Sequence, residues 1–143
     1  MRQVFHRFAT LGHERHNECF STGMQALERR HILGIYGENV AADFLSRHGF
    51  QILERNFRTR DGEIDIICEG EGALVFVEVK TRNSAGHLAG FEAITEEKIR
   101  RIRSAIHAWR RLNPGHHQSI RIDAISITVS AGKIGIDHLR EAA

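Results

Sequence analysis

Two carboxylates and an ammonium lie in short segments of this chain that are otherwise apolar. Asp65 is in residues 62–67 (GEIDII), and Glu78 and Lys80 are in residues 75–80 (VFVEVK). Ionisable side chains are rarely buried without a partner or a metal ion. We therefore interpret the three as one site, and a magnesium site that cuts a phosphodiester is the chemistry that fits them best.

The alternation of side chains along a strand puts Glu78 and Lys80 on the same face of a sheet. A hairpin-like connection would place Asp65 across from Glu78. Two carboxylates this close repel each other unless they are protonated or bridged by a metal, and hard oxygen ligands suit Mg²⁺ or Mn²⁺. Asp65 and Glu78 would hold the ion. Lys80 would align or deprotonate a water or neutralise the transition state, and Glu38 would complete the shell directly or through water.

The surrounding pattern predicts the elements that must position these residues. Apolar residues at three- and four-residue spacing predict a helix over 37–48, in whose first turn Glu38 has a structural use of its own, since a helix N-terminus favours a carboxylate. Strands are predicted over 51–59, 63–69 and 73–81. Thr95 is expected to cap a helix that runs to about Arg111, followed by strands over 119–129 and 133–138. The fold class is α/β: one mixed β-sheet flanked by helices, in the order helix, three strands, helix, strand, strand.

The bulk properties bound the setting of this site. The chain has 143 residues, and we expect a poorly ordered extension over 1–33, with Met24 as an alternative start, and one domain over 34–143. No apolar run reaches membrane-spanning length, and the two cysteines form no disulfide framework, so a reducing cytoplasm is expected.

The basic residues are mostly arginines: only Lys80, Lys98 and Lys133 among the 20 are lysines. Arginine suits phosphate recognition, although a GC-rich genome explains the bias equally well. Candidates for contact with a nucleic-acid backbone, or for a solvated rim, are Arg55, Arg58, Arg60, Arg82, Lys98 and Arg101. Trp109 keeps step with the isoleucines of its helix and is expected in the core. Asp123 is expected to pair with an arginine rather than to bind a metal.

Asp65, twelve intervening residues and then Glu78-Val79-Lys80 resemble the split carboxylate pattern of the PD-(D/E)XK nuclease superfamily. More narrowly, the chain resembles the YraN family of bacterial proteins, which is related to archaeal Holliday-junction resolvases. Segments 36–41, 53–58, 62–65, 75–80 and 121–123 carry the resemblance, and Lys98 also falls where that family usually has a lysine. Ile64 stands where the superfamily name has a proline.

The resemblance implies a restriction-endonuclease-like core in which Glu38, Asp65, Glu78 and Lys80 take over the nuclease quartet. It also implies an Mg²⁺- or Mn²⁺-dependent endonuclease acting on DNA, with branched or flap structures among its substrates, and a homodimer. The alternative is a catalytically silent nucleic-acid-binding or protein-interaction module on the same fold. A third, weaker interpretation is a structural acidic pair in an unrelated α/β domain.

Overall fold

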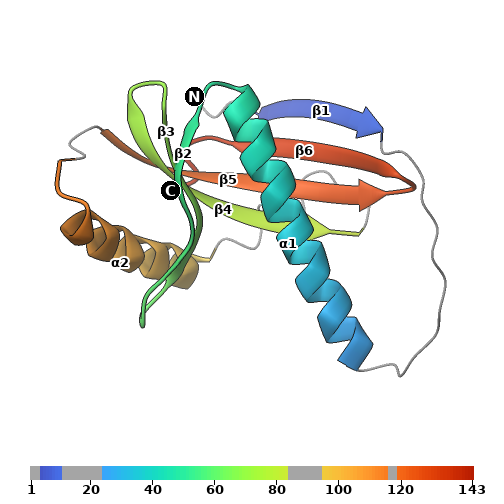
Figure 1. Ribbon diagram of the computed structural model, residues 1–143, viewed down its shortest axis with the longest axis horizontal. Helices are drawn as coiled ribbons and strands as arrows, with labels where there is room; N and C mark the ends of the chain where they lie inside the picture. The colour runs from blue at the N-terminus through green and yellow to red at the C-terminus, as the bar shows by residue number, and fades with distance from the viewer. Residues whose placement is uncertain (1–3, 11–23, 84–94, 116–118) are drawn as a thin grey trace.

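The described part of the chain forms six strands and two helices. The computed structural model describes residues 4–10, 24–83, 95–115 and 119–143 (Figure 1). The elements in chain order are β1 (Val4–Thr10), α1 (Met24–Arg47), β2 (Gln51–Arg58), β3 (Glu63–Gly70), β4 (Ala73–Arg82), α2 (Glu96–Leu112), β5 (Ser119–Ser130) and β6 (Lys133–Leu139). The order after β1 is the one that the sequence predicts, and the α/β fold class is confirmed.

All the strands join one mixed sheet with the spatial order β1-β6-β5-β4-β3-β2. Among the described strands, only β4 and β5 pair in parallel, and every other neighbouring pair is antiparallel. A parallel pair needs a crossover connection, and α2 lies in the segment that supplies it. Because β4 is covered on both faces, its apolar run continues through both sets of alternating residues.

The two helices cover opposite faces of the sheet. Val75 and Val77 of β4 belong to the core cluster that contains Phe44 and Leu45 of α1. The alternate β4 residues, Leu74 and Phe76, pack in a second cluster with α2, whose buried residues are Ile102, Ala105, Ile106 and Trp109. Alternation continues along β4, so Glu78 and Lys80 project on the α2 side.

Helix α1 is longer than the sequence pattern indicates, beginning at Met24 rather than at Gly37. Its first turns extend beyond the sheet (Figure 1), and Leu27 and Ile32 there are 67% and 60% exposed. Apolar periodicity reports the face of a helix that is buried, so turns that bury nothing give no such signal. The expected start of the helix is therefore wrong.

The structure also differs from the poorly ordered extension that was expected over 1–33. Residues 4–10 form β1, which pairs with β6, and α1 covers 24–33. Residues 1–3, 11–23, 84–94 and 116–118 lie outside the described residues. In the part of the chain that is described, no helix is long and apolar enough to cross a membrane.

Candidate functional site

Strands β3 and β4 stop pairing just before the candidate carboxylates. The last paired residues are Ile66 and Val77, so Asp65 and Glu78 occupy the next position along the two strands. Beyond this point the backbone N–H of Val79 donates to Oδ2 of Asp65 over 2.7 Å. The Asp65 carboxylate thus takes the place of the missing ladder bond, which fixes it beside the end of β4.

Glu78 has one oxygen paired and one oxygen unpaired. Its Oε1 lies 3.0 Å from Nζ of Lys98, near the start of α2, and its side chain is only 13% exposed. Its Oε2 is buried and has no hydrogen-bond partner among the described residues. A buried carboxylate oxygen without a partner is costly, so this atom offers an open position for a proton or a cation.

Both carboxyl groups hold their protons more tightly than usual. The pKa of Asp65 is raised from 3.8 to about 7, first by burial and then by the negative charge of Glu78, against the stabilising Val79 N–H. Burial also raises the pKa of Glu78, although the positive charges of Lys98 and Lys80 oppose it. A divalent cation between the two groups would compete with these protons and relieve the repulsion.

Lys80 and Glu38 lie near this pair without a direct contact that the structure records. Lys80 is exposed, and its charge lowers the pKa of Glu78. Glu38 is half-buried in the middle of α1, and its charge raises the pKa of Asp65. The expected first-turn position of Glu38 is wrong because α1 starts earlier. A helix-start role therefore no longer accounts for this carboxylate.

The approach of α1 to β4 depends on Gly37. A Cβ at this position would overlap Oγ1 of Thr81, near the end of β4. The backbone of α1 therefore packs directly on the strand that carries Glu78 and Lys80. This close approach brings Glu38, the next residue, to the edge of the site.

The candidate metal ligands at this site are all carboxylates. Carboxylate oxygens bind Mg²⁺ or Mn²⁺ better than a soft metal. Within the described residues, no three His, Cys, Asp or Glu side chains converge closely enough to hold a metal ion. Mg²⁺ commonly takes one or two protein carboxylates and fills its other positions with water and substrate phosphate. Asp65 and Glu78 meet that requirement as a pair.

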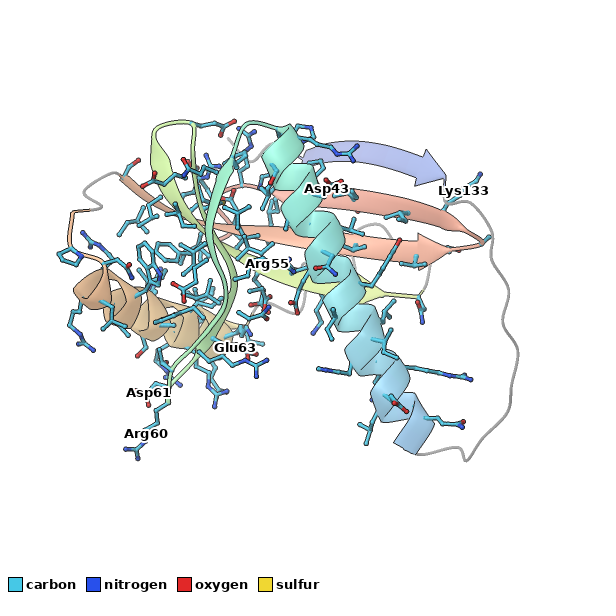
Figure 2. All side chains as sticks on the ribbon, viewed as in Figure 1. Asp43, Arg55, Arg60, Asp61, Glu63 and Lys133 are labelled. Carbon is cyan, nitrogen blue, oxygen red and sulfur yellow. The ribbon has the colours of Figure 1, made fainter. Side chains whose placement is uncertain are left out.

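The six basic candidates do not form one group. Four of them, Arg58, Arg60, Lys98 and Arg101, line one cavity between the β2–β3 hairpin and α2. Arg55 instead donates to Oδ1 of Asn39 on α1 over 2.7 Å, and Figure 2 shows it on the stretch of hairpin nearest that helix. Arg82 ends β4.

A second buried polar cluster lies on the other face of the sheet. Arg121 donates through Nε and Nη2 to the two oxygens of Asp123, at 2.9 and 3.1 Å. His138 Nε2 lies 2.8 Å from the same carboxylate. Burial raises the pKa of Asp123, but the bond to His138 and the charge of Arg121 outweigh it and hold this pKa below its usual value. The predicted pairing of Asp123 with an arginine is confirmed.

Two contacts at the candidate site were missed from the sequence. The sequence makes Lys98 a candidate for a nucleic-acid contact or for a solvated rim, yet its ammonium contacts Glu78, and it lies 3.9 Å from Oε1 of Glu63. No local pattern joins residues twenty or more positions apart, and only the packing of α2 on the sheet brings them together.

Trp109 is 2% exposed, which confirms its predicted place in the core, and its Nε1 donates to Glu54 over 2.6 Å.

Comparison with known proteins identifies the relatives of this chain. The model of "Uncharacterised protein family UPF0102" matches residues 37–127, which is more than half of the chain and spans all four candidate residues. The chain belongs to the UPF0102 family. UPF0102 is the YraN family that the motifs indicated, and membership of it is consistent with the endonuclease-like superfamily.

The UPF0102 relatives are similar over most of their length. A UPF0102 protein of Syntrophomonas wolfei is 43% identical over 110 residues, covering 77% of this chain and 96% of the relative. One from Renibacterium salmoninarum is 43% identical over 109 residues, covering 76% and 92%. One from Mycolicibacterium vanbaalenii is 35% identical over 121 residues, covering 84% of this chain and 100% of the relative.

Proposed function

We propose that this UPF0102 protein is an Mg²⁺- or Mn²⁺-dependent endonuclease that hydrolyses phosphodiester bonds in DNA. The observation that carries the proposal is the half-buried pair of Asp65 and Glu78, in which the buried Oε2 of Glu78 has no partner among the described residues and the pKa of Asp65 is raised to about 7. Such a pair is costly to keep unless a cation or a reaction makes use of it.

The ligands follow from the positions of the carboxylates. Asp65 and Glu78 would hold the ion, and Glu38, which influences Asp65 only at a distance, would act through a water molecule. A bound Mg²⁺ stabilises charge on a phosphoryl oxygen and lowers the pKa of a coordinated water.

The residues of the chain divide the remaining tasks. The exposed Lys80 is free to reach the attacking water or the phosphate, and would align or deprotonate that water or neutralise charge as the transition state forms. Lys98 holds Glu78 in place from α2 and acts as a positioning residue. Branched and flap DNA and a homodimer belong to the same proposal and rest on the resemblance to resolvases. A cytoplasmic location also belongs to it and rests on the cysteine content and on the lack of an apolar run of membrane-spanning length.

A cleavage assay tests this proposal. Labelled linear, flap and four-way-junction DNA are incubated with the protein in Mg²⁺, Mn²⁺ or EDTA, alongside the variants Asp65→Ala and Lys80→Ala. Asp43→Ala is the matched control, because Asp43 is an exposed carboxylate in a surface ion pair. Metal-dependent cleavage that both site variants lose and the control keeps supports the proposal. Absence of cleavage on every DNA in both metals refutes it.

One observation favours a second candidate function, a catalytically silent binding module. Lys98 places a positive charge 3.0 Å from Glu78, so the chain itself partly neutralises the site. DNA binding that persists in EDTA, with no cleavage in any metal, would support this alternative.

A further inference from the structure

A cavity lies beside the carboxylates, between the end of the β2–β3 hairpin and the first turns of α2. Its volume is about 270 Å³, near the lower limit of roughly 300 Å³ for small-ligand pockets. Figure 2 shows Arg60 and Asp61 at the tip of the hairpin, with Glu63 closer to α2. The charged residues that line the cavity are Arg58, Arg60, Asp61, Glu63, Lys98 and Arg101. We call it the hairpin cavity.

Hydrogen bonds hold the hairpin in shape at this cavity. The Thr59 hydroxyl donates to the carbonyl of Gly62 over 3.0 Å and accepts from the backbone N–H groups of Asp61 and Gly62. A Cβ on Gly62 would overlap the carbonyl oxygen of Arg101. The hairpin backbone at Gly62 therefore lies directly on the backbone of α2, and the cavity beside this contact is pre-formed.

The lining carries more positive than negative charge. Four cations face two carboxylates, and Glu63 is already shared between Arg58 at 3.6 Å and Lys98 at 3.9 Å. These are long, partly exposed ion pairs, which contribute little and yield readily to a better anion. Guanidinium groups bind phosphate oxygens in a bidentate manner, so this arrangement favours a phosphate ligand.

Two residues of the hairpin cavity also lie close to the carboxylate pair of Asp65 and Glu78. Lys98 lines it and contacts Glu78, and the charge of Glu63 raises the pKa of Glu78. A phosphate bound here would thus lie beside the phosphodiester held at Asp65 and Glu78. We infer that the hairpin cavity binds a second backbone phosphate of the same nucleic acid and so positions the strand for cleavage. The identity of the ligand rests on the proposed function.

The salt dependence of DNA binding tests this inference without any turnover. Binding of a fluorescent duplex is measured in EDTA from 50 to 300 mM KCl for the protein, for Arg58→Ala/Arg60→Ala and for Arg101→Ala. The control is Arg110→Ala/Arg111→Ala, which removes two exposed charges from the far end of α2. We expect the cavity variants to bind about tenfold more weakly at low salt, with a slope of log K against log[salt] that is smaller by about 0.9 for each phosphate that the variant no longer neutralises. Slopes that match those of the control variant would overturn the inference.

Two further measurements give the alternatives separate outcomes. Arg58→Lys/Arg60→Lys keeps the charge and loses the planar fork, so its affinity should fall between those of the parent protein and the alanine variant. A deoxynucleoside monophosphate should compete only weakly, and competition below 1 mM would indicate a small-ligand site and overturn the inference. If the parent protein cleaves DNA and the cavity variants have the same salt slopes as the control variant, only the role of the hairpin cavity is rejected. If the cavity variants have reduced slopes and the parent protein never cleaves, only the nuclease proposal is rejected.

Discussion

Lys98 Nζ lies 3.0 Å from Glu78 Oε1, although the two residues belong to different elements, α2 and β4. The contact joins the helix that crosses between the parallel strands to the strand that carries the candidate site. Glu78 is 13% exposed and Lys98 is 28% exposed, so solvent screens this pair only partly. The pair therefore contributes to folding as well as to the position of the carboxylate.

Lys98→Met should destabilise the metal-free protein by roughly 1–3 kcal/mol at pH 8, because it leaves a half-buried charge without its counterion. Lys98→Met/Glu78→Gln should recover part of that loss. Urea unfolding in EDTA measures both. Arg47→Met, which breaks an exposed i,i+4 pair with Asp43, should cost no more than about 0.5 kcal/mol. Equal losses for Lys98→Met and Arg47→Met would contradict this account.

The raised pKa of Asp65, about 7, predicts how stability depends on pH. The folded state holds the Asp65 proton more tightly than the unfolded state, so this group stabilises the protein below pH 4. That contribution is lost as the pH rises towards 7. Metal-free Asp65→Asn should therefore lose less stability than the parent protein between pH 4 and pH 7, by on the order of 2–4 kcal/mol at about 1.4 kcal/mol per pKa unit.

Denaturant unfolding across this pH range, with EDTA present, checks the Asp65 prediction. Asp43→Asn serves as the control, because Asp43 is an exposed carboxylate, and its pH dependence should follow that of the parent protein. If Asp65→Asn gives the same pH profile as Asp43→Asn, Asp65 does not carry the raised pKa.

Gly37→Ala should destabilise the protein by roughly 1–3 kcal/mol, because the new methyl group overlaps Thr81 and forces α1 away from β4. Gly34→Ala is a matched control in the same helix, since its Cβ would meet no atom within 4 Å. That substitution should instead stabilise the helix by about 0.5–1 kcal/mol. Thermal unfolding of the two variants should give shifts of opposite sign, and two equal shifts would argue against the close approach.

Asp123→Asn should lower stability by roughly 3 kcal/mol, because Asp123 is fully buried and is bonded to Arg121 and His138. Its effect on DNA cleavage should be small at temperatures where the variant is folded. The reason is that Asp123 and its partners face α1, on the other side of the sheet from Asp65 and Glu78. Unfolding and cleavage measured on one preparation separate the two effects. A folded Asp123→Asn variant with no cleavage would place Asp123 in the machinery.

The strand pattern predicted that Glu78 and Lys80 share a face of the sheet and that Asp65 lies beside Glu78, because alternation fixes the face of each residue and the hairpin fixes the neighbouring strand. The same reasoning could not find the contact between Lys98 and Glu78, which depends on how α2 crosses the sheet. It could not find the pairing of Asp123 with His138 either, since the register of β5 and β6 decides it.

Glu38 shows a different limit of the sequence pattern. The apolar period begins near Gly37 because α1 meets the sheet there, while the turns before it bury little. A period of this kind locates a buried face rather than a helix end. The position of Glu38 in mid-helix, and with it the loss of a capping role, therefore required the structure.

The most direct test of the central claim follows Mn²⁺ binding and junction cleavage in one titration. Bound Mn²⁺ is counted by electron paramagnetic resonance while the cleaved fraction of a labelled four-way junction is measured in the same samples. For the parent protein and Asp43→Asn, cleavage should rise in step with bound Mn²⁺. Glu78→Gln should weaken binding by at least tenfold and abolish cleavage at matched Mn²⁺. Unchanged Mn²⁺ binding by Glu78→Gln, or full occupancy of the parent protein without cleavage, would contradict the claim.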